Sequence, residues 1–214
     1  MKNNVIIFDL DGTLINTDTL IRQSFEFVFK KYKPGYELGD EEFLTFLGPS
    51  LKATFSRYFE EDLLDELVEY YNVHNLAHHE DYVTIYPTVI ETLEFLKEKG
   101  YKLAVLTTKR QRAAMLGIRM FDLEKYFDVI ICGDQLEKQK PDPEGIYKIL
   151  SALKCDKAVM VGDNPSDIYA GKNANVYSVG VKWTPKGEDS LNACHPDYML
   201  NEMKDLIQFV EGVK

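Results

Sequence analysis

Acidic side chains, a hydroxyl and a lysine follow short apolar runs at several points of the chain. Asp9 and Asp11 follow the first run. Thr107 follows a second run, Asp163 follows a later one, and Lys140 lies in the segment between them. The functional crevice of an open parallel sheet lies outside the carboxyl ends of its strands, so we expect these side chains to meet at one rim.

A cluster of carboxylates of this kind requires a cation. Asp167 follows Asp163 by four residues and brings a fourth carboxylate to the same rim. Carboxylates that share a small site repel one another, and a hard divalent ion removes that repulsion. Mg²⁺ is usually held by one or two carboxylates together with waters and phosphate oxygens. Lys140 and the backbone N–H groups near Gly12 and Thr13 could then bind the remaining phosphate charge, which favours phosphoryl transfer with Mg²⁺ as cofactor.

Alternating strands and helices must position these residues. Near-continuous apolar runs are typical of parallel strands with helices on both sheet faces. They predict five strands: Val5–Phe8, Lys102–Thr107, Phe127–Cys132, Ala158–Val161 and Val176–Val181. Crossover helices are predicted near 109–120, 143–153 and 166–173. A further helix is predicted over 88–100, where Thr88 and Glu91 would form a capping box. The predicted fold class is α/β with a doubly wound parallel sheet.

Residues 17–82 interrupt this alternation. Their apolar spacing predicts only helices, over 17–33, about 40–47, from Pro49-Ser50, and about 62–78. We therefore predict an all-helical cap domain over 17–82, inserted into a core formed by 1–16 and 83–214. Two short linkers suit a hinged lid, and a rigid appendage is the alternative. The segment holds 14 acidic and 6 basic side chains, so it carries −8 of the net charge of −10.

Four motifs resemble those of a known enzyme family. Asp9-Leu10-Asp11-Gly12-Thr13-Leu14 resembles the signature of the haloacid dehalogenase superfamily of phosphohydrolases. Thr107, Lys140 and the segment Gly162–Asp167 resemble its second, third and fourth motifs, in the same order. Within the superfamily the chain is similar to the phosphoglycolate phosphatase-like group, and in that group to inorganic pyrophosphatases of the bacillus type. The resemblance implies a Rossmann-like core with a helical cap. It also places glycines where this chain has Thr88 and Asn175, which bears on loop geometry.

The resemblance implies a role for each residue. Asp9 would be the nucleophile that forms an aspartyl-phosphate, and Asp11 would be the general acid and then the general base. Thr107 would hold a phosphate oxygen, and Lys140 would offset negative charge. Mg²⁺ would be held by Asp9, the backbone carbonyl of Asp11, and Asp163, with Asp167 supporting these ligands. Substrate contacts are expected from a further set: Gly12, Thr13, Thr108, Lys109 and Ser50.

Several of these residues also have a purely structural interpretation. Asp11-Gly12 could be only a turn, and Asp163 could only cap the following helix. Lys140 could be a solvated lysine, as could Lys109 beside Arg110. Ser50 could serve only to start a helix. These alternatives would all have to hold together for the predicted site to be absent.

The predicted function is a Mg²⁺-dependent phosphatase that acts on a small phosphorylated metabolite, such as phosphoglycolate, or on pyrophosphate. A phosphomutase of the same superfamily forms the same intermediate and stays an alternative. A non-catalytic phosphate-binding regulatory module is another, and it predicts damage to at least one catalytic position. Dehalogenase chemistry is disfavoured, because it does not need the leaving-group acid that Asp11 supplies.

Composition argues against several other classes of protein. With 35 acidic and 25 basic side chains, the overall field repels nucleic-acid backbones and anionic membranes. No apolar run approaches the roughly 20 residues that span a bilayer, and no signal peptide is visible. Three cysteines without a CxxC pair suit a reducing compartment. We therefore expect a soluble, cytoplasmic enzyme, and its oligomeric state cannot be read from the sequence.

Overall fold

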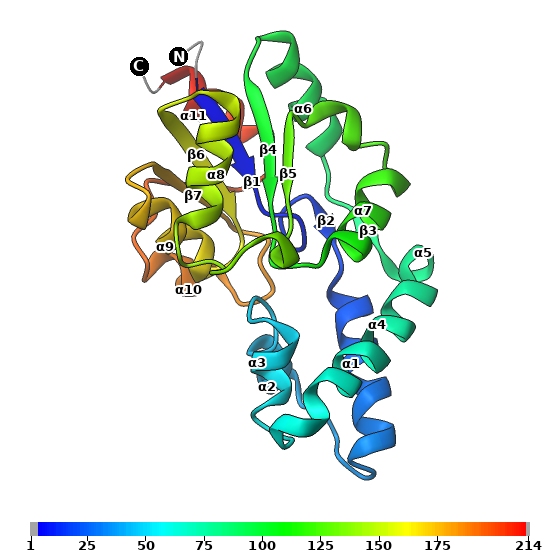
Figure 1. Cartoon of the computed structure of the whole chain (residues 1–214). Coiled ribbons are helices and arrows are strands. Elements are labelled where there is room, and N and C mark those ends of the chain that lie inside the picture. Colours follow the sequence, from blue (N-terminus) through cyan, green and yellow to red (C-terminus); the bar gives the residue numbers. More distant parts are fainter. Residues whose placement is uncertain (1–3, 213–214) are drawn as a thin grey trace. The chain divides into compact units, whose positions relative to one another are not determined.

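Six parallel strands form the central sheet of the structure, a computed structural model that describes residues 4–212 (Figure 1). The strand order is β5-β4-β1-β6-β7-β8, and every neighbouring pair is parallel. The chain adds strands outward on one side of β1 and then returns to add the others from β6. The point where the order reverses, between β1 and β6, is where ligands bind in open α/β sheets. The bounds are β1 Asn4–Phe8, β4 Lys102–Leu106, β5 Val129–Ile131, β6 Lys157–Gly162, β7 Tyr177–Val181 and β8 Tyr198–Leu200.

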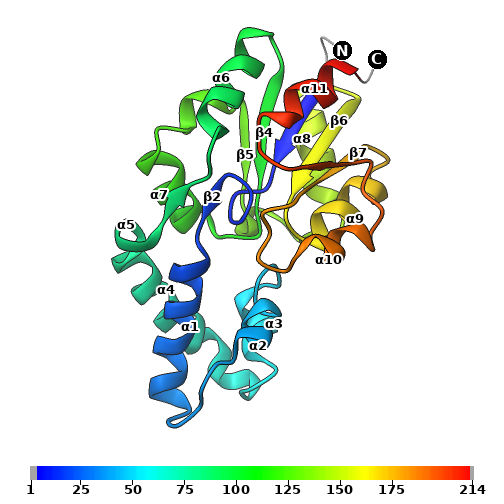
Figure 2. The same cartoon turned by 180° about the vertical axis from the view of Figure 1, so that it is seen from behind.

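Helices cover both faces of this sheet, which explains the continuous apolar runs. The side chains of Val5 to Phe8 in β1 are fully buried, although they point alternately to opposite faces. Helices α8 (Glu144–Leu153) and α9 (Pro165–Asn173) pack on one face, where Ile146 and Ala170 join the same apolar cluster as Ile7. Helices α6 (Val89–Glu98) and α11 (Asp205–Gly212) lie on the other face, in front of the sheet in Figure 2. The predicted fold class is confirmed.

Shorter elements complete this part of the chain. Helix α7 (Gln111–Met120) follows β4, and α10 (Glu188–Asn192) follows β7. Two 3₁₀ turns, η2 (Glu124–Tyr126) and η3 (Gly133–Gln135), flank β5. All five predicted strands are present, with ends that differ by one or two residues. The sixth, β8, was not predicted, because three residues are too few to show a periodic pattern.

The predicted capping box at the start of α6 is wrong. Thr88 has the left-handed backbone angle φ = 61°, and its side chain makes no capping hydrogen bond to the helix. The Oγ1 atom of Thr88 instead accepts a hydrogen bond from the backbone N–H of Lys204 at 3.3 Å. Asn175 is also left-handed, with φ = 57°. The family resemblance places glycine at both positions. Both have the left-handed backbone conformation, which glycine adopts more readily than other residues do.

The chain divides into two compact units. One consists of Met1–Asn16 with Ile85–Lys214, and the other of Thr17–Thr84. The short strands β2 (Ile15–Asn16) and β3 (Thr84–Ile85) lie at the two connections and pair with each other. This division differs by two residues at the second connection from the boundary that the sequence suggested.

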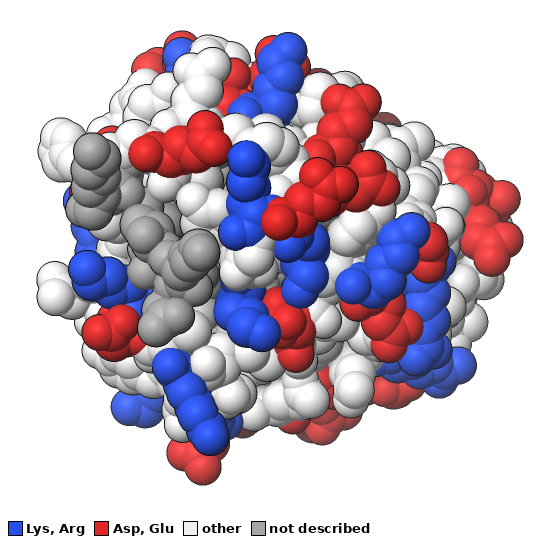
Figure 3. Space-filling view, turned by 90° about the horizontal axis from the view of Figure 1, so that it is seen from above, with Lys and Arg blue, Asp and Glu red and all other residues white. Residues whose placement is uncertain are grey.

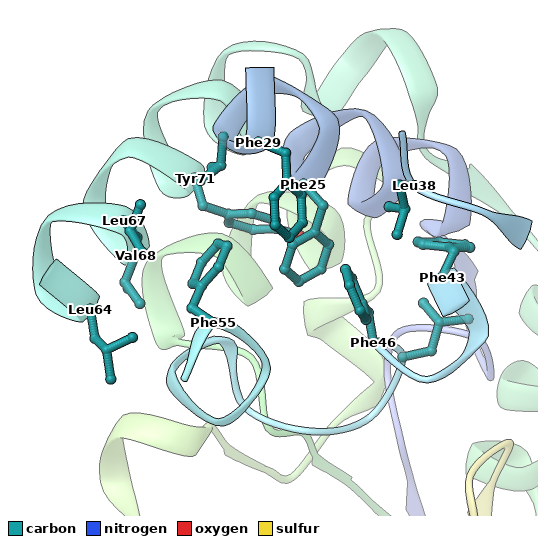
Figure 4. Close-up of a cluster of buried hydrophobic side chains, with 12 residues drawn as sticks. Phe25, Phe29, Leu38, Phe43, Phe46, Phe55, Leu64, Leu67, Val68 and Tyr71 are labelled. Atoms are coloured by element: carbon teal, nitrogen blue, oxygen red, sulfur yellow. The ribbon is translucent and has the colours of Figure 1, made fainter. Parts of the chain in front are cut away.

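The unit Thr17–Thr84 has its own aromatic core. Its helices are α1 (Asp18–Tyr32), α2 (Asp40–Leu44), α3 (Leu51–Phe55), α4 (Leu64–Ala77) and α5 (His79–Tyr82), with the 3₁₀ turn η1 (Glu61–Leu63) before α4. The ring of Phe25 lies at the centre of the cluster in Figure 4. Its centroid is 4.8 Å from that of Phe46, 5.3 Å from Phe55 and 4.9 Å from Tyr71. Such ring contacts stabilise this unit through its own side chains.

The surface of the protein carries charged side chains of both signs. On the face of the molecule shown in Figure 3, acidic and basic side chains are interspersed among uncharged ones. Across residues 4–212, no helix has both the length and the apolar character to span a membrane.

Candidate active site

The loop after β1 holds Asp9 and turns the chain back sharply. The backbone N–H of Asp9 donates to Val161 of β6 at 2.9 Å, so the sheet pairing continues past the end of β1. The carbonyl of Leu10 then accepts from Leu14 at 2.9 Å and from Ile15 at 3.1 Å. These bonds close a tight loop whose apolar residues are buried. Asp9 is therefore fixed at the carboxyl end of the central strand.

Gly12 is required in this loop for two reasons. Its φ of 78° is left-handed, and a Cβ atom at this position would collide with the carboxylate of Asp163. The Oγ1 atom of Thr13 donates to Asp163 Oδ1 at 3.2 Å. The absence of a side chain at Gly12 thus lets the loop after β1 approach the end of β6. The two predicted backbone contacts, Gly12 and Thr13, lie directly beside a predicted metal ligand.

Lys140 lies between two carboxylates and is almost completely buried. Its Nζ atom is 3.0 Å from Asp9 Oδ1 and 2.6 Å from Asp167 Oδ1, and it donates to the Leu106 carbonyl at 3.0 Å. Burial by itself lowers the pKa of Lys140, but Asp167 and Asp9 raise it above its ordinary value. Lys140 therefore carries a positive charge inside the protein. The interpretation as a solvated lysine is wrong.

The pKa of the Asp9 carboxyl group is strongly perturbed. Burial raises the pKa of Asp9 from 3.8 to about 7, against the lowering effect of Lys140. The neighbouring carboxylates of Asp167 and Asp11 raise it further. Strongly perturbed groups of this kind are frequent at functional sites, because burial and neighbouring charges there tune the pKa values of catalytic groups.

Asp167 is held by the start of α9. It is fully buried, and its Oδ2 atom accepts from the backbone N–H of Asn164 at 3.0 Å. Asn164 in turn caps α9, because its Oδ1 atom accepts from Ser166 N at 3.2 Å. A Cβ atom at Gly162 would collide with the Asp167 carboxylate. One carboxylate oxygen of Asp167 therefore contacts Lys140 and the other contacts Asn164. These contacts suit the supporting role that was predicted for Asp167.

Three carboxylates of the site fit a divalent metal ion. Asp9, Asp163 and Asp167 each offer an oxygen atom, and these atoms lie within 4.8 Å of one another. All of them are hard oxygen donors, with neither thiolate nor imidazole in the group, which is the donor set that Mg²⁺ or Ca²⁺ prefers. The buried negative charge exceeds what Lys140 alone offsets, so a cation would relieve the repulsion.

Asp11 lies on the more exposed side of the site and pairs with Lys109. The Nζ atom of Lys109 is 2.9 Å from Asp11 Oδ1, and the Lys109 side chain is only 11% exposed. Its backbone N–H donates to Thr107 Oγ1 at 3.1 Å. Thr107 is itself buried, and its N–H bonds to the Ile131 carbonyl at 3.1 Å. The end of β4 therefore brings a hydroxyl and a second lysine to the loop of Asp11.

Thr108 and Ser50 are placed differently. Thr108 is partly buried, and its carbonyl lies so close to Gly133 that a Cβ atom there would collide with it. Ser50 belongs to the other compact unit, where its Oγ accepts from Ala53 N at 3.3 Å and caps α3. The structure thus gives Ser50 the helix-starting role that was the alternative interpretation. A substrate contact by Ser50 stays a prediction.

The sequence interpretation missed two neighbours of the site. Trp183, in the segment after β7, donates from Nε1 to the Gly12 carbonyl at 3.1 Å. Burial lowers the pKa of Lys186, in the same segment, and the charges of Asp163 and Asp167 oppose that lowering. The available signal was their position, since both follow the end of a predicted strand and so lie at the functional edge of the sheet.

The chain is similar to known proteins over most of its length. Residues 6–181 match the family model described as haloacid dehalogenase-like hydrolase. Pyrophosphatase PpaX of Halalkalibacterium halodurans is 44% identical over 216 residues, which cover 100% of this chain and 99% of that protein. A predicted phosphatase from Clostridium acetobutylicum has a TM-score of 0.87 at 26% identity, covering 99% of both chains. A Thermotoga maritima protein assigned as a beta-phosphoglucomutase has a TM-score of 0.76 at 28% identity, covering 99% of this chain and 100% of its own.

The chain therefore belongs to the haloacid dehalogenase-like hydrolase family. The resemblance based on its four motifs is confirmed, and so is the finer likeness to pyrophosphatases of the bacillus type. The expectation that it is an enzyme of the hydrolase class is confirmed as well.

Proposed function

We propose that this protein is a Mg²⁺-dependent phosphatase that hydrolyses pyrophosphate, or a similarly small phosphate ester, through an aspartyl-phosphate on Asp9. The observation that carries the proposal is the position of Asp9, between the buried ammonium of Lys140 at 3.0 Å and the carboxylates of Asp163 and Asp167. The 44% identity to a named pyrophosphatase over the whole chain supports pyrophosphate as the first substrate to test.

Asp9 would attack the phosphorus atom, and the loop around it keeps its carboxylate in place. Its Oδ1 atom accepts from Leu10 N at 2.7 Å and faces Lys140 Nζ, so the orientation of the carboxylate is fixed before substrate binds. Fixed donors that offset developing charge lower a reaction barrier without reorganising during the step. Thr107 and the backbone N–H groups near Gly12 and Thr13 would hold the phosphoryl oxygens.

Asp11 would donate a proton to the leaving oxygen and later remove one from the attacking water. Its position two residues after Asp9, with Lys109 at 2.9 Å, keeps the two carboxylates in one loop but gives them different neighbours. Asp9 is buried against Lys140, whereas Asp11 is more exposed. Different surroundings suit one carboxylate to nucleophilic attack and the other to proton transfer.

Mg²⁺ would be held by Asp9, Asp163 and the backbone carbonyl of Asp11, with Asp167 supporting them through its contacts to Lys140 and Asn164. When bound, it would neutralise negative charge on the phosphoryl oxygens. The three carboxylates within 4.8 Å of one another support this assignment.

Phosphate release from pyrophosphate, measured with and without Mg²⁺, tests the proposal. Asp9→Asn should abolish turnover while the protein stays folded. Asp156→Asn is a matched control, because Asp156 is an exposed carboxylate that precedes β6 at the opposite end of the sheet. Substantial Mg²⁺-dependent release by Asp9→Asn would overturn the assignment of the nucleophile.

A phosphomutase is the second candidate, favoured by the 28% identity to the Thermotoga maritima protein. It would form the same aspartyl-phosphate but return the phosphoryl group to another position of the substrate. Incubation with a hexose monophosphate separates the two functions. A positional isomer of the sugar phosphate would identify a mutase, whereas free sugar and phosphate would identify a phosphatase.

The unit Thr17–Thr84 is proposed to be the cap domain of the enzyme, joined to the catalytic core through β2 and β3. Its separate aromatic core and its two short connections support movement as one body. Slower hydrogen exchange in the two connections when a non-hydrolysable pyrophosphate analogue binds would support a closing lid. Unchanged exchange there would favour a rigid appendage.

A further inference from the structure

The backbone of Lys109 is fixed on both sides at the end of β4. Its N–H donates to Thr107 Oγ1 at 3.1 Å, and its carbonyl accepts from Gly133 N at 2.9 Å. Gly133 follows β5 and lies so close to the Thr108 carbonyl that a Cβ atom there would collide with it. The segment after β5 therefore packs against the loop after β4 and holds Lys109 in one position.

The ammonium group of Lys109 contacts the proposed general acid. Its Nζ atom is 2.9 Å from Asp11 Oδ1, and the Lys109 side chain is mostly buried. A charge-assisted hydrogen bond is stronger where little water reaches it. An ammonium group has three N–H donors, so Lys109 can keep its bond to Asp11 and contact an anion at the same time.

Lys140 and Lys109 contact opposite participants in the proposed reaction. Lys140 lies 3.0 Å from Asp9, the proposed nucleophile, whereas Lys109 lies 2.9 Å from Asp11, the proposed acid. The attacking and leaving oxygens are roughly in line on opposite sides of the phosphorus atom. The acid must come within hydrogen-bond reach of the leaving oxygen. A cation that contacts Asp11 therefore lies on the leaving-group side of the site.

The leaving group of pyrophosphate brings negative charge to that side. When Asp9 forms its bond to one phosphorus, the bond from that phosphorus to the bridging oxygen breaks, and the oxygen keeps the electron pair. It takes the proton of Asp11 and leaves as inorganic phosphate. Water then attacks the aspartyl-phosphate, gives a proton to Asp11 and releases the second phosphate. A simple alkyl phosphate follows the same steps but loses an uncharged alcohol.

We propose that Lys109 binds the leaving phosphate and thereby selects pyrophosphate over phosphate esters of uncharged alcohols. This inference rests on the proposed phosphatase function and adds to it the residue that selects the substrate. The competing role for Lys109 is to orient Asp11 alone, and the two roles predict different results.

Phosphate release from pyrophosphate and from ethyl phosphate separates these roles. For Lys109→Met, kcat/KM for pyrophosphate should fall about 10- to 100-fold more than kcat/KM for ethyl phosphate, as expected for the loss of one bond between charged groups. Lys109→Arg should recover part of this ratio, because it keeps the charge. Arg112→Met is the matched control, because it removes a positive charge at an exposed position near the start of α7. It should keep the wild-type ratio.

Ethyl phosphate is the right comparison because its leaving group is the harder one to expel. Ethoxide is more basic than phosphate, so the ester depends more strongly on protonation by Asp11. If Lys109 only orients Asp11, its loss should harm ethyl phosphate at least as much as pyrophosphate. That result would overturn the inference, and so would the same fall in the ratio for Arg112→Met.

Binding of two analogues tests the contact without any proton transfer. Methylenediphosphonate has carbon in place of the bridging oxygen of pyrophosphate, and methylphosphonate presents a single phosphoryl group. In titration calorimetry with Mg²⁺ present, Lys109→Met should weaken the binding of methylenediphosphonate about 10-fold or more relative to that of methylphosphonate. Neither analogue takes a proton from Asp11, so equal losses of affinity for both would overturn the inference.

Failure of this inference and failure of the proposed function give different results. Wild-type protein that hydrolyses ethyl phosphate but not pyrophosphate would overturn the role of Lys109 and leave a phosphatase. Wild-type protein that hydrolyses neither would refute the proposed function itself. If it hydrolyses pyrophosphate alone, the ratio of the two binding constants decides the role of Lys109.

Discussion

Replacing Asp9 by asparagine should make the metal-free protein more stable at alkaline pH although it removes the proposed nucleophile. The pKa of Asp9 is about 7 in the folded protein and 3.8 in its ordinary state, mainly because of burial. At about 1.4 kcal/mol for each pH unit, this difference corresponds to roughly 4 kcal/mol. The side chain is only 13% exposed, so solvent screens little of this cost. Asparagine is uncharged, like the protonated carboxyl group, so burying it does not cost this free energy.

The pH dependence has a definite sign. Below pH 3.8 the carboxyl group is protonated in both states, and it contributes no difference. Between pH 3.8 and about 7 the folded state binds more protons than the unfolded state, so the free energy of unfolding falls as pH rises. Above pH 7 the carboxyl group is charged in both states, and the whole loss of free energy of unfolding is present. Wild type should therefore lose stability relative to Asp9→Asn from pH 5 to pH 8.

Urea denaturation in EDTA at a series of pH values measures this effect. The difference between the two proteins should grow to about 2–4 kcal/mol by pH 8 and should nearly vanish at about pH 3. Saturating Mg²⁺ should reverse it, because the ion stabilises the wild-type carboxylates and binds the variant less tightly. Parallel stability curves for the two proteins in EDTA would refute the reasoning about burial and charge at Asp9.

Three further predictions follow from single contacts. Gly12→Ala should lower kcat/KM by about 100-fold or more, since the new Cβ collides with Asp163; steady-state phosphate release measures it, and near-normal activity would contradict the required close approach. Phe25→Ala should cost about 3–5 kcal/mol in urea denaturation, because a buried ring with three aromatic neighbours is lost; a cost below about 1 kcal/mol would show that the cluster contributes little. Burial raises the pKa of Asp128, but bonds from Leu103 N–H and Lys97 outweigh this and lower it. Asp128→Asn should therefore cost about 1 kcal/mol at pH 7, with the difference from wild type disappearing as pH falls below 3.8; a cost that is the same at pH 3 would contradict the charge effect.

The strand ends were predictable because burial leaves a strong mark on the sequence. Strands covered on both faces must be apolar throughout, so the first polar residue after each run marks the carboxyl edge of the sheet. Asp9, Thr107 and Asp163 were found in this way. Strand β8 was not predicted because three residues are too few to show a periodic pattern. The predicted capping box was wrong because Thr88 has a left-handed backbone, which local sequence patterns do not reveal.

Contacts between distant segments were not predictable from residue types alone. The bond from Trp183 to Gly12 joins residues 171 positions apart, and it depends on the pairing of β6 with β7. The order of the strands placed Lys140 at the same rim as Asp9, but the burial of Lys140 could not be predicted, since its own segment resembles a solvated loop. The buried ion pairs on both sides of its ammonium group come from the folded sheet and from the start of α9.

Mass spectrometry of protein quenched in acid during turnover of pyrophosphate tests the central claim most directly. The peptide that contains Asp9 should gain the mass of one phosphoryl group, and the gain should disappear in Asp9→Asn. A modification on another residue, or rapid turnover with no covalent adduct under conditions that preserve acyl phosphates, would contradict the assignment of Asp9 as the nucleophile.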